Sequence, residues 1–273
     1  MSFEAEQILT LISLYILPFA RLSGFLMVLT VISSRAIPPR FRLLLAVAIT
    51  IVVVPTLPDY SEQSAFLIAG KTSQFASTFL TAKGWLLVIE QTLIGIALGF
   101  VSRLLMETFV VGGQIIAMQS GLGFASLIDP ANGTNVPALG QFFLMMSSLI
   151  FLAVDGHLLM IRLVVESFTS FPIGSSMDIY GMFYELVNWA KWIFAAAILI
   201  AVVPMASLLI VNLTFGVMAR AAPQINIFAV GFPMTLVSGL ILIWLTLGYF
   251  LPHFERQFNR ASEVMCTMVN LQC

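Results

Sequence analysis

The stretch WIFAAAILIAVVPMASLLIVNLTFGVMA, from Trp192 to Ala219, contains no charged side chain. A second apolar run, from Ala221 to Phe254, follows it, and the single charge of Arg220 separates the two. An α-helix needs about 20 mainly apolar residues to cross the hydrocarbon core of a membrane. Both runs reach that length, and neither shows the alternation of period two that a membrane β-barrel requires. The sequence therefore predicts membrane-type helices here.

The composition extends this interpretation to the whole chain. Of its 273 residues, 60% are hydrophobic and only 9% are charged. A soluble domain has about 25% charged residues, so this chain has too few polar side chains to cover its apolar surface. That surface must face a lipid bilayer or apolar partner subunits. The formal net charge of −1 gives no indication of a nucleic-acid ligand.

Further apolar segments lie upstream and predict about six to eight helices in total, paired as helical hairpins. They are Ile8 to Ser33, Leu43 to Leu57, Trp85 to Phe109, Pro137 to Val154 and Leu158 to Phe171. We expect an all-α fold with broken helices, in a single domain over residues 1–273. Glu4 and Glu6 stand where a secretory signal carries positive charge, so no cleaved signal peptide is expected.

Charged side chains inside these segments are candidates for polar contacts. An ionisable group at the centre of a membrane helix costs about 2.5–3.5 kcal/mol or more unless it finds a partner. Arg21 and Glu90 have no local partner, which favours contacts between helices or between subunits. For two pairs spaced four residues apart, such contacts and local ion pairs are equally compatible with the sequence. These pairs are Arg103 with Glu107 and Arg162 with Glu166.

Glycines predict two kinds of feature. Gly95 and Gly99, in IGIALGF, have the spacing that lets two helix backbones approach closely. The stretch VVGGQIIAMQSGLGFASLIDP, from Val110 to Pro130, is instead too rich in glycine for a regular helix. Two interpretations of this stretch remain open: a tightly packed, kinked helix, and a flexible apolar constriction.

A second interruption, RAAPQINIFAVGFP, runs from Arg220 to Pro233. Its prolines break the apolar run, and the amides of Gln224 and Asn226 can form hydrogen bonds across helices. Both a discontinuous transporter helix and the turn of a hairpin fit this pattern.

The sequence contains no HExxH, GxSxG or Walker motif, and no ligand-spaced cluster of His, Cys and carboxylates, so we expect neither an enzyme nor a metal or cofactor site. Cys266 and Cys273 are expected to be incidental free thiols rather than a disulfide.

Taken in order, these motifs resemble the FliR/SctT family of the bacterial type III export apparatus, and above all FliR of the flagellar export gate. The match spans nearly the whole chain, and RAAPQINIFAVGFP is its most specific part. The residues that carry it are Glu90-x-x-x-Ile94-Gly95-x-x-x-Gly99-Phe100, Gly113-Gln114, Gln119-x-Gly121-Leu122-Gly123-Phe124, Asp129-Pro130, Gly156-His157, Ser167-Phe168, Phe171-Pro172-x-Gly174 and Arg220-x-x-Pro223-Gln224-x-Asn226-x-Phe228-x-x-Gly231-Phe232-Pro233.

The resemblance implies a multi-pass subunit in the inner membrane, within the flagellar basal body. It implies a FliP-like part joined to a FliQ-like part, assembled with FliP-like and FliQ-like subunits into the channel for unfolded flagellar proteins. FlhB-like and FlhA-like subunits would associate with that channel. Apolar helices of such assemblies also lie partly above the bilayer, buried against one another.

The resemblance further implies that a glycine-rich loop plugs the closed pore. The matching positions are Gly112, Gly113, Ile115, Ile116, Met118, Gln119, Gly121, Leu122, Gly123 and Phe124. The apolar side chains among them would form the seal, and Gly121 and Gly123 would let it move aside. Arg21, Glu90, Arg103, Glu107, Arg220, Gln224 and Asn226 are the expected interhelix or intersubunit contacts.

Other functions remain alternatives. A virulence injectisome contains a close relative of this subunit, although the Gly231-Phe232-Pro233 sequence favours the flagellar branch. A small-molecule secondary transporter would need an inverted repeat and polar groups that converge at the midplane of the membrane. An intramembrane hydrolase ranks last, because the sequence offers no catalytic set.

Overall fold

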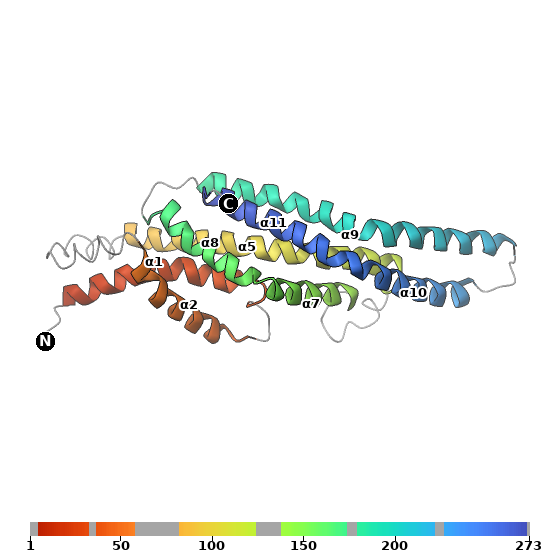
Figure 1. Ribbon diagram of the computed structural model, residues 1–273, viewed down its shortest axis with the longest axis horizontal. Coiled ribbons are helices and arrows are strands. Elements are labelled where there is room, and N and C mark those ends of the chain that lie inside the picture. The colour runs from red at the N-terminus through yellow and green to blue at the C-terminus, as the bar shows by residue number, and fades with distance from the viewer. Residues whose placement is uncertain are drawn as a thin grey trace. The chain divides into compact units, whose positions relative to one another are not determined.

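The computed structural model of the chain describes residues 5–32, 37–57, 82–123, 138–173, 179–221 and 227–271. Every element within these ranges is helical (Figure 1), so the all-α prediction is confirmed. The elements are α1 (Ala5–Val28), α2 (Pro39–Val53), the 3-10 helix η1 (Val54–Thr56), α5 (Ala82–Gln119), α7 (Ala138–Ala153), α8 (Gly156–Ser170), α9 (Ile179–Ala221), α10 (Ile227–Thr246), the 3-10 helix η3 (Leu247–Tyr249) and α11 (Phe250–Met268).

The chain divides into two compact units, each assembled from separated parts of the sequence. Unit 1 consists of Met1–Arg103, His157–Val187 and Ala261–Cys273, and unit 2 consists of Leu104–Gly156 and Asn188–Arg260. The division falls inside the helices α5, α9 and α11 and after the first residue of α8. A single domain over residues 1–273 stays a prediction.

Within the described residues, four helical stretches are long and apolar enough to cross a membrane, or up to five if the bent pair α7–α8 counts as one span. They are Pro39–Thr56, Ala82–Gln119, Tyr180–Ala221 and Ala229–Met268. The last three contain 38, 42 and 40 residues, so each extends roughly 57–63 Å at about 1.5 Å per residue. A hydrocarbon core is only about 30 Å thick. The chain therefore has the helices of a multi-pass membrane protein, and the longest of them are far longer than one crossing requires.

The core of unit 1 consists of apolar side chains from α1, from the first part of α5 and from α8. Leu22 and Phe25 on α1, Leu98 on α5 and Val164 on α8 are at most 1% exposed. Helix α2 buries one stripe, formed by Ala46, Thr50 and Val53. That spacing of three and four residues places the stripe on a single face of α2.

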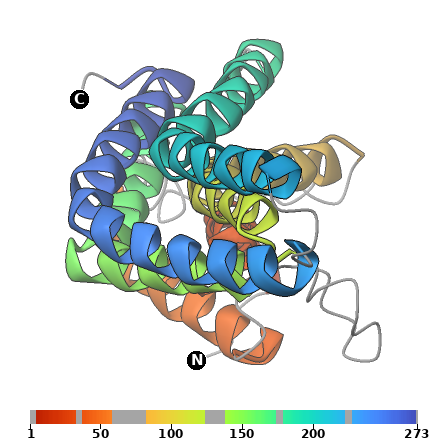
Figure 2. The same ribbon diagram turned by 90° about the vertical axis from the view of Figure 1, so that its right-hand side faces the viewer.

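The core of unit 2 is a cluster of phenylalanines. Phe109 on α5 lies between the rings of Phe250 and Phe254 on α11, with centroids 5.0 and 5.5 Å away. Phe143 on α7 meets Phe250 edge to face at 5.4 Å, where α11 passes alongside α7 in both views (Figures 1 and 2). Tilted and edge-to-face pairs of this kind match the ring quadrupoles and add to the burial of apolar surface.

Two expected interruptions differ from the structure. Gly112 and Gly113 do not break a helix, because α5 continues to Gln119. Pro233 does not end the apolar run either, because it lies inside α10. Helix α9 ends instead at Ala221 and α10 begins at Ile227, and the two helices run in opposite directions (Figure 1).

Candidate functional site: the glycine-rich end of helix α5

The two adjacent glycines of α5 serve close packing within unit 2. A Cβ on Gly113 would lie 3.0 Å from the carbonyl oxygen of Leu139 on α7, and one on Gly112 would lie 3.4 Å from the carbonyl oxygen of Ala197 on α9. Neighbouring helices thus compensate for the low helix propensity of glycine, because they approach where side chains are missing. This packing explains why α5 stays regular where its sequence predicts a break.

Helix α5 ends in a turn that requires glycine. The N–H of Ser120 donates to the carbonyl of Ile116 over 3.0 Å, and the N–H of Gly123 donates to the carbonyl of Ala117 over 2.9 Å. Between them, Gly121 adopts a φ of 81°, a conformation that L-residues with a side chain rarely adopt. The chain therefore leaves α5 in a direction that only a glycine at position 121 allows without strain.

Helix α10 packs directly against this turn. A Cβ on Gly121 would lie 3.0 Å from the ring of Phe232, and a Cβ on Gly239 would lie 2.6 Å from the Cβ of Ser120. Ser120 itself is fully buried, and its hydroxyl donates to the carbonyl of Ala117 over 3.1 Å. Helix α10 thus packs on the turn at two positions. The ring of Phe232 packs on Gly121, and Gly239, which has no side chain, leaves room for Ser120.

The apolar residues expected to seal a pore do not share one environment. Ile116 is 1% exposed and belongs to the core of unit 2, whereas Met118 is 72% exposed. Ile115, Gln119, Leu122 and Gly123 are half-buried, and Phe124 lies outside the described residues. Only part of the predicted set is therefore available at the surface of this chain.

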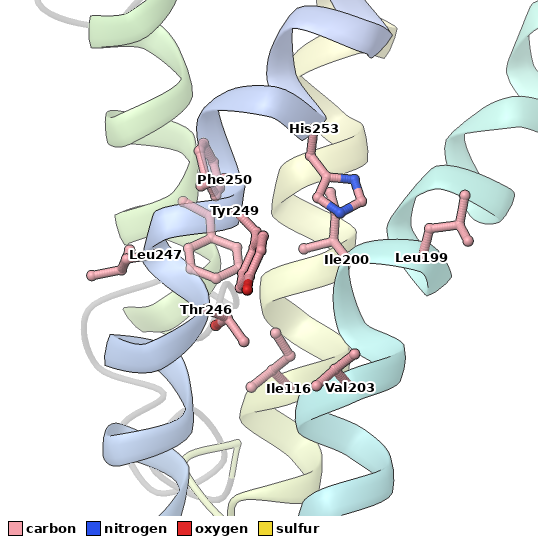
Figure 3. Close-up of a pocket in the computed structure, with 10 residues that line it drawn as sticks. Ile116, Leu199, Ile200, Val203, Thr246, Leu247, Tyr249, Phe250 and His253 are labelled. Carbon is pink, nitrogen blue, oxygen red and sulfur yellow. The ribbon is translucent and has the colours of Figure 1, made fainter.

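A cavity of about 390 Å³ lies beside the same end of α5 (Figure 3). Its walls come from α5, α7, α9 and the η3 region, with Ile116 and Val203 on one side and Thr246 and Tyr249 on the other (Figure 3). The lining is mainly apolar, and His253 supplies its only ring nitrogens among the lining residues. The Nδ1 of His253 lies 3.2 Å from Nη2 of Arg256 on the same helix.

Arg21, predicted to make contacts between helices, lies at the centre of unit 1 with 0% exposure. Its Nε donates to Oε1 of Gln91 over 2.8 Å. Its Nη1 donates to the carbonyl and to the hydroxyl of Ser167 over 3.0 and 2.9 Å, and its Nη2 donates to the carbonyl of Phe171 over 3.1 Å. The guanidinium carbon also lies 4.2 Å from the ring centroid of Phe168. Arg21 thereby joins α1, α5 and the C-terminal end of α8.

Glycines allow the close approach of α1 and α5 around Arg21. A Cβ on Gly95 would overlap the carbonyl oxygen of Arg21, and one on Gly99 would lie 2.7 Å from the carbonyl oxygen of Phe25. On the α1 side of the same contact, a Cβ on Gly24 would lie 2.6 Å from the carbonyl oxygen of Thr92 on α5. The small-residue spacing in the sequence thus corresponds to a contact of two backbones inside this chain.

The remaining predicted polar residues differ in exposure. Glu90 and Glu107 are half-buried, and Arg103 and Arg220 are exposed. Arg220 stands in the last turn of α9, where a cation suits the helix dipole. Gln224 and Asn226 lie outside the described residues. Of the two pairs spaced by four residues, Arg162 and Glu166 form an ion pair of 2.7 Å at the surface.

Sequence reasoning missed several partners. Gln91 and Ser167 complete the site around Arg21, and Phe232 and Gly239 pack on the end of α5. An uncharged amide beside Glu90, inside an apolar helix, is a signal that could have identified Gln91. The contacts of Phe232 and Gly239 depend on the pairing of α5 with α10, which the sequence does not specify.

The described ranges hold no group of three or more His, Cys, Asp or Glu that could bind a metal ion. Cys266 is disulfide-bonded, so the prediction of a free thiol is wrong at this position. A disulfide depends on the distance and direction of two Cβ atoms, which residue spacing near a chain end does not reveal.

Comparison with known proteins identifies the family. The model of the bacterial export proteins, family 1, matches residues 12–261. Flagellar biosynthetic protein FliR of Escherichia coli (strain K12) is 33% identical over 268 residues, which cover 97% of this chain and 96% of that protein. FliR of Pectobacterium carotovorum subsp. carotovorum is 32% identical over 98% of this chain and 97% of its own length. FliR of Bacillus subtilis (strain 168) is 24% identical over 97% of this chain and 98% of its own. The chain belongs to the bacterial export proteins, family 1, and is a relative of flagellar biosynthetic protein FliR.

Proposed function

We propose that this chain is a non-enzymatic subunit of the flagellar type III protein export gate, in the inner membrane at the flagellar basal body. FliP-like and FliQ-like subunits would complete the channel, and FlhB-like and FlhA-like subunits would associate with it. Unfolded flagellar proteins would be its cargo. Similarity to FliR from distantly related bacteria over nearly the whole chain supports this assignment.

The exposed apolar surface of the long helices supports a hetero-oligomeric assembly. The most apolar parts of Tyr180–Ala221 and Ala229–Met268 are only 33% and 22% buried inside this chain. Each of these helical stretches is about twice as long as a hydrocarbon core is thick. A bilayer therefore covers only part of each helix, and apolar partner subunits are the natural cover for the rest.

The end of α5 carries the proposal of a pore plug. Gly121, with its φ of 81°, directs the chain out of the helix, and the 72% exposed Met118 stands one turn before it. A thioether side chain is flexible and polarisable, so it can adapt to an apolar ring of partner side chains. Leu122 and Gly123 follow, half-buried in this chain. In the closed gate this segment would block the channel, and in the open gate it would move aside.

Ion conductance tests the plug. Deletion of residues Gly121 to Gly123 in the assembled gate should make cells leak small ions, because the seal is lost while the helices that form the channel remain. A Gly216→Ala variant is the matched control, since a Cβ at that position meets nothing within 4 Å. Unchanged conductance in an assembled deletion variant would refute the plug.

Co-purification tests the gate itself. The affinity-tagged chain should capture FliP-like and FliQ-like subunits in a complex that is stable in mild detergent. A chain that inserts in the membrane but always purifies alone contradicts the proposal. Binding of a small solute by that isolated chain would then favour the transporter alternative.

A further inference from the structure

Helix α10 is the element that holds the base of the glycine-rich segment. The ring of Phe232 occupies the space that a side chain on Gly121 would need, and Gly239 leaves room for Ser120. Phe232 and Gly239 are seven residues apart on α10, which places them on one face of the helix, two turns from one another. A shift of α10 along or away from α5 must therefore change both contacts together.

Helix α10 does not continue regularly into α11. The 3-10 helix η3, Leu247–Tyr249, separates them. Just before it, the hydroxyl of Thr246 bonds back to the carbonyls of Leu242 and Ile243 over 2.9 and 3.0 Å. Such back-bonding bends helices, and a 3-10 stretch inside a long helix often marks a hinge. Gly248, in the middle of η3, has nothing within 4 Å of the place of its missing Cβ.

The cavity of about 390 Å³ adjoins this 3-10 segment (Figure 3). Thr246, Leu247 and Tyr249 form one wall, while Ile116 on α5 and Val203 on α9 form part of the opposite wall. The cavity is open to the surface, since Val203 and Tyr249 are largely exposed. Its free volume lies beside η3.

We propose that Phe232 and Gly239 are positioning residues through which α10 sets the base of the plug, and that η3 with its adjoining cavity is the hinge on which α10 moves when the gate opens. The proposal rests on the plug function of the α5 end. Phe232 and Gly239 act through Gly121 and Ser120, and neither needs to touch the exported protein. In the closed state both contacts are made. In the open state α10 bends at η3 and releases them.

A pair of small substitutions tests the contact between α10 and the turn. Gly239→Ala places a methyl group 2.6 Å from the Cβ of Ser120, which is too close for unbonded carbons. Ser120→Gly in the same chain removes the atom that clashes. Gly239→Ala alone should make the closed gate leak, and the double variant Ser120→Gly with Gly239→Ala should restore the seal. Gly216→Ala controls for the general effect of an added methyl group on a membrane helix.

Hydrogen exchange gives a readout of the same contact that does not depend on conductance. The amides of Ser120, Gly121 and Gly123 donate to carbonyls at the end of α5. In the purified complex, Gly239→Ala should speed their exchange at least about tenfold, which corresponds to about 1.4 kcal/mol. The double variant should return exchange to that of the parent chain. Unchanged exchange in Gly239→Ala, or no rescue in the double variant, overturns the role of α10.

The hinge has its own test. Gly248→Ala should stiffen η3, since alanine favours the helix and its methyl group has free space. Val203→Phe should fill part of the cavity. Both variants should leave the closed gate tight and slow the export of flagellar proteins. Normal export in both variants overturns the hinge.

The outcomes separate this proposal from the plug function. If deletion of Gly121 to Gly123 leaks but Gly239→Ala neither leaks nor changes exchange, the plug stands and the positioning role of α10 fails. If the deletion does not leak, the plug fails, and so does the gating role inferred for α10, whatever the exchange of the turn amides shows.

Discussion

Arg21 on α1 donates a hydrogen bond from its Nε to Oε1 of Gln91 on α5 over 2.8 Å, inside the core of unit 1. The other recorded acceptors of Arg21 are oxygens of Ser167 and Phe171, at the C-terminal end of α8. None of these acceptors carries a formal charge. The end of a helix carries a partial negative charge of about half an electron, because its last carbonyls lack intrahelical partners. The partial charge at the end of α8 therefore favours the guanidinium, in addition to the electrostatic attraction of the Glu90 carboxylate.

Replacement of Arg21 should therefore destabilise unit 1 strongly. Arg21→Met keeps an unbranched apolar stem in place of the arginine stem but leaves the buried acceptors on α5 and α8 unpaired. Each unsatisfied buried group costs about 1–3 kcal/mol, so we expect a loss of several kcal/mol. The measurement is the thermal unfolding of the purified gate in detergent.

Arg21→Lys is the matched control for charge. Lysine keeps the positive charge but has one nitrogen in place of the planar guanidinium. It cannot reach Gln91 and all three acceptor oxygens at the end of α8 together, so it should recover only part of the stability lost in Arg21→Met. Full stability in Arg21→Lys would show that charge alone matters and that the geometry of the guanidinium does not.

The amide of Gln91 can be tested separately. Gln91→Leu preserves packing but removes the acceptor for Nε of Arg21, which should cost about 1–3 kcal/mol. Gln91→Glu places a carboxylate at the same position and should be tolerated, because a charge-assisted hydrogen bond is stronger than a neutral one. Unfolding by denaturant in detergent would rank the two variants. A Gln91→Leu variant as stable as the parent would contradict the role assigned to this bond.

The approach of α1 to α5 depends on Gly95 more than on any side-chain contact. Gly95→Ala forces a methyl group onto the carbonyl of Arg21, part of the helix backbone, which cannot rotate away. We expect α1 to separate from α5 and the assembled gate to be lost from membranes. Gly216→Ala, whose methyl group meets nothing within 4 Å inside this chain, should instead leave α1 packed on α5 and gain up to about 1 kcal/mol of helix propensity. Blue native electrophoresis of membranes would show both outcomes, and normal assembly of Gly95→Ala would contradict this packing.

The helical class of the fold could be predicted because it depends on composition and local apolar runs. The positions of helix ends within glycine-rich sequence could not. Gly113 has the same local propensity as Gly121, yet Gly113 lies in a regular helix and Gly121 adopts a φ of 81°. The difference comes from the neighbours: α7 packs on Gly113, and Phe232 packs on Gly121. Such tertiary contacts override propensity and cannot be read from one segment alone.

The hydrogen-bond partners of Arg21 likewise could not be predicted from the sequence. The cost of a buried charge singles out Arg21 from the sequence, since an arginine within an apolar helix needs partners. Its acceptors lie 70 and more residues away in the chain. No rule of spacing connects Arg21 with the carbonyl of Phe171, because a backbone acceptor has no sequence signature. The residue could be predicted, whereas its partners required the structure.

The phenylalanine cluster of unit 2 provides a last test, because it bears on whether the two units unfold together. Phe254 is fully buried, 5.5 Å from the ring of Phe109 and 6.1 Å from that of Phe258. Phe254→Ala should cost about 3–5 kcal/mol, as expected for a large cavity in a packed core. Combined with Arg21→Met, which acts in unit 1, the losses should add within about 0.5 kcal/mol, since the two residues share no partner.

If the units unfold independently, Phe254→Ala should lower only one of two thermal transitions. If the chain is one cooperative domain, a single transition should shift in each variant, and calorimetry of the purified gate distinguishes the two cases.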